Sequence, residues 1–204
     1  MEALEFYDGL AADNSKTYWA ARQPFYEESV RGPMLELLAA LEPEFGPGKI
    51  FRPYRDVRFS KDKTPYKTHL GAWLSFGGYV QLSGDGLAAG CGMYQLEPDQ
   101  LGRYRKAVAD ERTGAQLIAV LDEFERGKIG VHGHGSLKTV PRGYPKDHPR
   151  VDLLRHKGLT TWQEWPPAAW LGTAAARNRL VDFFRASRPL REWLDDHVGP
   201  SVPR

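Results

Sequence analysis

Seven lysine and arginine side chains stand against two aspartates in the segment Lys49–His69. A second segment, Lys138–Lys157, holds six against two. The two segments carry formal charges of +5 and +4, which leaves −7 for the remainder of a chain whose net charge is +2. Crowded cations repel one another, and a fold tolerates them when an anion or internal carboxylates lie among them. The spacing therefore predicts a cleft for a small phosphorylated or carboxylated ligand.

Arginine holds carboxylate and phosphate groups through paired hydrogen bonds, lysine adds a point charge, and hydroxyl groups complete such sites. The predicted ligand-binding residues of the two segments are Arg52, Arg55, Arg58, Ser60, Lys61, Lys63, Lys67, Lys138 and Arg142. We expect the two segments to face each other across one cleft. On that interpretation, Arg58→Ala or Arg142→Ala leaves the fold intact and removes the stabilisation that an added anion provides.

Proton-transfer groups also occur in the first segment. If the site is catalytic, the candidates are Asp56, Asp62, Tyr66 and His69, with Arg58 and Lys63 as charge stabilisers. The common glycine-rich, Walker-type, nucleophile-elbow and zinc-protease motifs are absent from the sequence, so no cofactor is predicted. His132 and His134 offer two imidazoles in a glycine-rich loop, whereas stable zinc sites use three or four ligands, so no metal site is predicted either.

Two other functions fit the same residues. In a nucleic-acid-binding module, the basic groove would follow a backbone while aromatic side chains stack bases, the candidates being Tyr54, Tyr66, Trp73 and Tyr79. An isoelectric point of about 8.6 and the −7 carried elsewhere argue against a long polyanion. In a structural or partner-binding domain, the basic segments would form internal salt-bridge networks with acidic side chains.

Hydrophobic periodicity predicts the elements that position these residues. The predicted helices are Glu2–Ala12, Lys16–Arg22, one starting at Pro33, Glu97–Ala109, Glu111–Arg126, Pro149–Arg155, Pro167–Ala186 and Pro189–Val198. The predicted sheet strands are Val57–Ser60, His69–Phe76, Tyr79–Ser83 and Leu87–Tyr94, and Leu159–Trp165 is expected to be extended. The sequence therefore predicts one α+β domain over residues 1–204, with a mainly antiparallel sheet packed by N-terminal and C-terminal helices.

Composition indicates a cytoplasmic protein. Cys91 is the only cysteine, which excludes an intramolecular disulfide, and its apolar strand predicts a buried, inert thiol. The longest runs without a polar residue or glycine have five residues, far below the ~20 that span a bilayer. We therefore predict no membrane helix.

Both basic segments carry a resemblance to a known family. The stretch from Phe51 to Lys67, Leu137-Lys138 with Pro141-Arg142-Gly143, and the end of the second segment at Leu153–Lys157 resemble the domain of unknown function 2461. The resemblance runs over nearly the whole chain and implies that the two basic segments belong together, in a family of conserved hypothetical proteins without an assigned reaction. The chain departs from the pattern at Val131–Gly135, which weakens a functional interpretation of the two histidines there.

Overall fold

A computed structural model of the chain describes residues 2–202. The chain divides into two compact units, Met1–Ala89 with Glu164–Phe183 (unit 1) and Gly90–Gln163 with Phe184–Arg204 (unit 2). Residues 2–202 contain six strands: β1 (Gly48–Ile50), β2 (His69–Leu74), β3 (Gly78–Ser83), β4 (Gly86–Met93), β5 (Gly130–His134) and β6 (Gly158–Trp165). They are hydrogen-bonded in the order β1-β2-β3-β4-β6-β5, and antiparallel pairs join β1 to β2, β2 to β3 and β5 to β6. The predicted α+β class with a mainly antiparallel sheet is confirmed. No helix within residues 2–202 combines the length and apolar character needed to cross a membrane.

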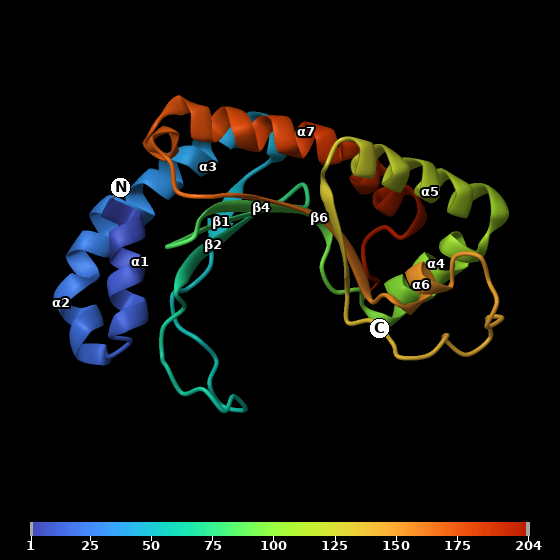
Figure 1. Cartoon of the computed structure of the whole chain (residues 1–204), viewed down its shortest axis with the longest axis horizontal. Helices are drawn as coiled ribbons and strands as arrows, with labels where there is room; N and C mark the ends of the chain where they lie inside the picture. Colours follow the sequence, from blue (N-terminus) through green and yellow to red (C-terminus); the bar gives the residue numbers. More distant parts are fainter. Residues whose placement is uncertain (1, 203–204) are drawn as a thin grey trace. The chain divides into compact units, whose positions relative to one another are not determined.

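Unit 1 begins with helices, and the winding of α2 (Lys16–Tyr26) passes without a break into η1 (Glu27–Arg31) and α3 (Gly32–Phe45) despite prolines at positions 24, 33 and 43 (Figure 1). The helical elements are α1 (Glu2–Ala12), α2 (Lys16–Tyr26), the π-helical η1 (Glu27–Arg31) and α3 (Gly32–Phe45). The Ser15 hydroxyl accepts a hydrogen bond from the Tyr18 N–H and caps α2, as its position predicts. Helix α2 was predicted to end at Arg22, but the winding continues past Pro24 and widens into η1.

Three short strands follow in unit 1: β1 (Gly48–Ile50), β2 (His69–Leu74) and β3 (Gly78–Ser83). One face of β2 and β3 carries buried Leu70, Ala72, Leu74 and Val80, which form part of the core. The predicted strand Val57–Ser60 is wrong, because those residues form part of a loop and the strand that pairs with β2 is β1. Phe59 is 97% exposed, which shows that the alternating apolar residues of this segment do not pack against a core.

Strands β4 (Gly86–Met93) and β6 (Gly158–Trp165) were both predicted within two residues. Cys91 on β4 is buried, and burial raises the pKa of its thiol to about 11. The short η2 (Ala169–Gly172) and α7 (Ala174–His197) complete the chain. The predicted boundary before Pro189 is wrong, since α7 runs through this residue and its buried side continues from Leu180 to Leu194.

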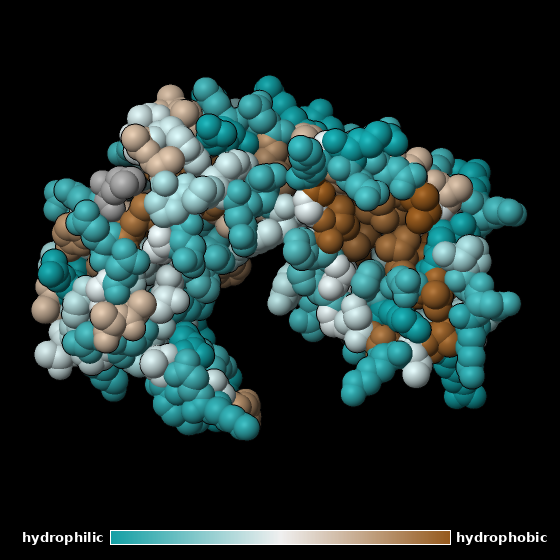
Figure 2. Space-filling view, in the orientation of Figure 1, coloured by the Kyte–Doolittle hydropathy of each residue, from teal (hydrophilic) through white to brown (hydrophobic). Residues whose placement is uncertain are grey.

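Unit 2 consists of helices and strands around a core of its own. Its remaining elements are α4 (Pro98–Ala109), α5 (Glu111–Arg126), β5 (Gly130–His134) and α6 (Val151–Arg155). Tyr104, Leu117, Leu154 and Trp193 are among the side chains buried in this core, and the Trp193 indole N–H donates to the Thr113 carbonyl at 2.9 Å. Partly buried apolar residues pack against the core, and Figure 2 shows apolar atoms gathered at the surface beneath α5.

The last described residues are attached to α4 through one carboxylate. Asp99 accepts hydrogen bonds from the Val202 N–H at 2.9 Å and the Ser201 hydroxyl at 2.8 Å, and it pairs with Arg103 at 3.1 Å. The Val202 N–H is the main cause of the lowered pKa of Asp99, followed by the Ser201 hydroxyl. A carboxyl whose pKa is lower in the folded state stabilises the fold above its unfolded pKa and loses that contribution as pH falls through the folded value.

We therefore expect the Ser201–Val202 attachment to be intact at neutral pH and to be released only in strong acid, below the ordinary aspartate pKa. Hydrogen exchange at the Val202 amide against pH measures this. Asp99→Asn, which lacks the charge, should exchange fast at pH 7, while Asp122→Asn on α5 is the control. Equal protection of Val202 in the wild type and Asp99→Asn at pH 7 would contradict the assignment.

Candidate functional site

The first basic segment forms the long loop between β1 and β2, and the base of this loop is rigidly built. The Arg55 N–H donates to the Pro65 carbonyl at 2.9 Å, and the Lys67 N–H donates to the Pro53 carbonyl at 2.8 Å. An antiparallel bridge joins Tyr54 to Tyr66 between them. The two sides of the loop therefore run together as a short ladder that extends from the sheet.

Helices α1 and α2 hold this ladder in place. The Asn14 side chain donates to the Tyr66 carbonyl at 3.1 Å and accepts from the Tyr66 N–H at 3.0 Å. The Tyr66 ring is buried and stacks on Trp19 with ring centroids 4.5 Å apart. Burial raises the pKa of Tyr66, and Tyr54 adds to the effect. Tyr66, a predicted proton-transfer candidate, thus lies in a packed aromatic contact.

At the tip of the loop, the two aspartates bind arginines of the same loop. Arg55 donates to Asp62 and to Thr64, and Arg58 pairs with Asp56 at 2.7 Å. The Thr64 N–H and the Arg55 guanidinium lower the pKa of Asp62 to about 2, and Arg58 lowers the pKa of Asp56. Both carboxyls are therefore ionised at neutral pH and bonded to neighbours. This is the arrangement expected if Arg55 and Arg58 belong to an internal salt-bridge network.

The other tip residues are directed outward or toward the backbone. Lys63 donates to the Val57 carbonyl at 2.9 Å, and the Ser60 N–H approaches the same carbonyl at 3.4 Å. Lys61 is exposed beside them. Of the predicted loop ligands, only Arg52 and Lys67 lie at the base, next to the sheet.

The face of the sheet opposite the core is aromatic and basic in unit 1. Lys49 on β1 lies opposite Trp73 on β2, and Trp73 lies opposite Tyr79 on β3. Phe51 continues this face beyond β1, where its ring lies 6.3 Å from that of Tyr79, and the Lys67 ammonium lies 5.5 Å from the Phe51 ring centroid. Phe51 and Trp73 are 42% and 39% exposed. We call these five residues the aromatic-basic face.

A glycine makes this face flat. A Cβ atom at Gly71 would lie 2.6 Å from the Tyr79 hydroxyl oxygen, so only glycine lets the Tyr79 ring lie across β2. The Tyr79 hydroxyl is in turn held by the Gln81 side chain at 3.1 Å. The Tyr79 ring is therefore held in place before any ligand binds.

Among residues 2–202, no carboxylate neutralises the two cations of this face, Lys49 and Lys67, or the neighbouring Arg52. Within residues 2–202, Lys49, Arg52 and Lys67 form no ion pair or side-chain hydrogen bond. Burial is the main cause that lowers the pKa of Lys67, and the nearby positive charge of Arg52 lowers it further. Two like charges thus stand close together beside exposed aromatic rings.

His69 lies at the other end of the same face, beside a small polar pocket of about 220 Å³. Asp8, Gln81, Ser83 and Asp85 are among the residues that line it. Burial lowers the pKa of His69, with a further contribution from Lys67, so its imidazole is neutral at pH 7. Of the four proton-transfer candidates, His69 lines this pocket, whereas Asp56 and Asp62 lie at the loop tip and Tyr66 in the aromatic contact with Trp19.

The second basic segment lies in unit 2, between β5 and the start of β6. Lys138 and Arg142 are exposed on an irregular loop. Arg150 donates to the Val108 carbonyl at 2.6 Å and the Ala109 carbonyl at 3.1 Å, at the end of α4. It therefore acts as a helix cap, because the last carbonyls of a helix lack intrahelical partners. The meeting of the two basic segments stays a prediction.

His132 and His134 lie on β5, and their predicted placement in a loop is wrong. The reason is that β5 pairs with all of Gly158–Trp162 on β6, a pairing that glycines at positions 130 and 133 permit. His134 hydrogen-bonds the Thr160 hydroxyl at 2.8 Å, and the His156 ring occupies the space where a Gly133 side chain would lie. Residues 2–202 contain no group of three or more histidine, cysteine, aspartate or glutamate residues placed to hold a metal ion.

Sequence reasoning missed three contributors to the site: Asn14, Lys49 and Phe51. Lys49 and Phe51 alternate with Gly48 and Ile50, and this alternation is the signal that could have placed them on one face of a strand. Nothing in the sequence around Asn14 indicates that it would bond to the backbone of Tyr66.

Comparison with known proteins agrees with the resemblance. The family model of conserved hypothetical proteins DUF2461 matches residues 2–193, so the chain belongs to this family. A conserved hypothetical protein from Pyrococcus furiosus has a solved structure with 14% identity and a TM-score of 0.38, covering 79% of this chain and 92% of that one. No curated protein matches the chain.

Proposed function

We propose that this member of the DUF2461 family binds a small anionic ligand that carries a flat ring, such as a nucleotide, on the aromatic-basic face of unit 1. The observation that carries the proposal is the position of Lys67, which lies 5.5 Å from the centroid of the exposed Phe51 ring and close to Arg52. Neither cation has a carboxylate partner within residues 2–202. A bound phosphate would relieve the repulsion between the two cations.

The ring of the ligand has its own partners. The rings of Trp73 and Phe51 are partly exposed to water, so a ring of the ligand can stack on them. Stacking of a base on an aromatic side chain contributes about 1–3 kcal/mol. Gly71 and Gln81 keep Tyr79 flat against the sheet, so the platform does not have to be ordered when the ligand binds. The phosphate and the ring are thus recognised by adjacent groups.

A short single strand of nucleic acid is the second candidate. The observation in its favour is the row formed by Lys49, Trp73 and Tyr79 across three strands, which offers more than one stacking surface. The negative charge carried outside the basic segments opposes a long polyanion. We therefore favour the small ligand.

Thermal shift and calorimetry on the full chain test the proposal with AMP, adenosine, inorganic phosphate and an eight-nucleotide oligothymidine. AMP should raise Tm more than adenosine or phosphate alone, because only AMP uses both parts of the site. A ligand at 100 times its Kd stabilises the protein by about 2.7 kcal/mol. A larger effect of the oligonucleotide than of AMP at equal nucleotide concentration would favour the second candidate.

Four variants locate the site. Lys67→Gln and Trp73→Ala should each abolish most of the shift caused by AMP. Lys61→Gln and Arg58→Ala, at the loop tip, should retain it, and loss of the exposed Arg58–Asp56 pair should change stability little. Loss of the shift in the tip variants would place the anion at the tip instead, and no shift with any anion would contradict ligand binding altogether.

A further inference from the structure

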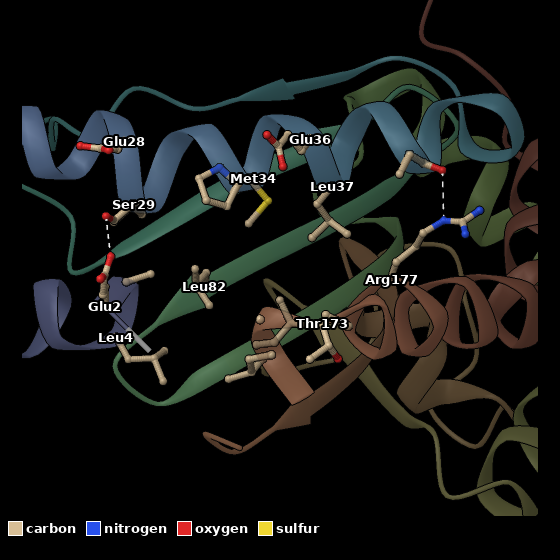
Figure 3. Close-up of a pocket in the computed structure, with 18 of the residues that line it drawn as sticks. Glu2, Leu4, Glu28, Ser29, Met34, Glu36, Leu37, Leu82, Thr173 and Arg177 are labelled. Atoms are coloured by element: carbon tan, nitrogen blue, oxygen red, sulfur yellow. Dashed lines mark hydrogen bonds between the residues drawn. The ribbon is translucent and has the colours of Figure 1, made fainter. Parts of the chain in front are cut away.

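Unit 1 contains a second concavity, on the core side of its sheet rather than on the aromatic-basic face. It is a groove of about 810 Å³ (Figure 3). Its walls are contributed by α1, η1, α3 and the chain from η2 to the start of α7, and its floor includes β3 and β4. The volume lies in the range of about 300–1,000 Å³ that is typical of ligand pockets.

The inside of the groove is apolar. Figure 3 shows Leu4, Met34, Leu37 and Leu82 projecting toward the open space from α1, α3 and β3. Leu82 is on the same face of the sheet as its partner Leu70, which is buried. The groove therefore lies on the core side of the sheet, between buried and half-buried apolar side chains.

The rim of the groove is acidic. Glu2, Glu28 and Glu36 line it, against one cation, Arg177. The Arg177 Nε donates to the Ala40 carbonyl at 3.4 Å, and Glu2 accepts from the Ser29 hydroxyl at 2.8 Å. Within residues 2–202, Glu28 and Glu36 form no ion pair. Two carboxylates thus stand without a counter-charge at the edge of an apolar space.

We infer that this groove binds an amphipathic cation, a molecule with an apolar body and a primary amine or guanidinium group. The apolar body would lie against the apolar lining, and the cation would lie at the rim beside Glu28 and Glu36. An apolar carboxylate fits less well, because the rim carries three carboxylates and one guanidinium. This site lies on the other side of the sheet from the aromatic-basic face and does not depend on the function proposed there.

A matched series of octyl compounds tests this inference on the full chain: octylamine, octanol and octanoate, each below its micelle concentration. Octylamine should raise Tm most and octanoate least, and the affinity for the amine should exceed that for the alcohol by up to about fivefold, the effect of one exposed ion pair. Equal effects of the three compounds would overturn recognition of the cation, and no stabilisation by any of them would overturn the site.

Variants separate the groove from non-specific binding. Glu28→Gln with Glu36→Gln should remove the preference for amine over alcohol, while Glu5→Gln, exposed on α1 outside the groove, should keep it. Leu37→Trp should block the groove and abolish stabilisation by both compounds, whereas Leu35→Trp, 43% exposed on α3, should not. If Leu37→Trp and Leu35→Trp respond to octylamine alike, the compound binds elsewhere and the inference is wrong.

Discussion

Trp193→Ala is expected to lower the free energy of unfolding of unit 2 by about 3–5 kcal/mol, the range for truncating a large buried aromatic side chain. Trp193 is 5% exposed in the core of unit 2, and its ring packs edge-on against Tyr104 at 6.2 Å and against His197 at 5.1 Å. The cavity and the lost hydrogen bond to Thr113 act in the same direction. Urea unfolding followed by circular dichroism measures the change.

Trp193→Phe separates the two contributions. Phenylalanine keeps most of the apolar volume and removes the indole N–H, so we expect a loss of about 1–3 kcal/mol from the unpaired Thr113 carbonyl and the smaller ring. Trp73→Phe, at a half-exposed position of unit 1, is the matched control and should change stability by less than about 1 kcal/mol. A Trp193→Ala protein as stable as the Trp73→Phe control would contradict the packing described for unit 2.

Gly158→Ala is expected to destabilise unit 2 by about 3 kcal/mol, at the upper end of the cost of overpacking. A Cβ atom at Gly158 would lie 2.0 Å from the Tyr94 carbonyl oxygen, 2.5 Å from its carbon and 2.7 Å from the Met93 carbonyl oxygen. All three are backbone atoms, so no side-chain rotation can relieve the overlap. The same measurement of urea unfolding detects the loss.

Gly102→Ala gives the opposite expectation in the same unit. Gly102 lies inside α4, is exposed, and has no heavy atom within 4 Å of its would-be Cβ. Alanine should therefore stabilise the protein by about 0.5–1 kcal/mol, because it restricts the unfolded chain and favours the helix. If both glycine variants change stability in the same direction, the close approach at Gly158 is not what constrains that position.

The strands that could be predicted from sequence are those whose alternation coincides with burial. In the predicted strands His69–Phe76 and Tyr79–Ser83, Leu70, Ala72, Leu74 and Val80 face the core, although β2 ends at Leu74 and Phe76 is exposed. The Gly84-Asp85 turn then leads into β4, which lies beside β3. Val57 and Phe59 show the same alternation. Periodicity indicates which side chains lie on the same face of an extended segment, but it does not indicate whether other elements pack against that face. At Phe59 nothing in residues 2–202 does so, as its exposure shows.

Local signals also failed where tertiary packing overrides them. Pro189 predicts a helix boundary, yet α7 continues through it because the buried side chains before and after it lie on one stripe. Glycines and histidines predict a loop at β5, yet pairing with β6 makes a strand of them. In both cases the deciding partner is distant in sequence.

The sequence predicted the positive charge of the candidate site, but it did not predict which arginines pair with which aspartates. The number of lysines and arginines indicated the basic loop. From the sequence, Asp56 and Asp62 could pair with any of these cations, and only the fold shows that Asp56 pairs with Arg58 and Asp62 with Arg55. Arg52 and Lys67 were among the residues predicted from sequence, but the position of Lys67 beside Phe51 follows only from the fold.

The rate at which a reagent labels the Cys91 thiol reports how often β4 opens locally. A thiol reagent reacts with the thiolate, and the raised pKa together with burial makes that form inaccessible while the strand is closed. Labelling at neutral pH therefore proceeds only as fast as the strand exposes this residue. Because the chain has no other cysteine, a single labelling trace reports the opening of one known position, and it does so without engineering the protein.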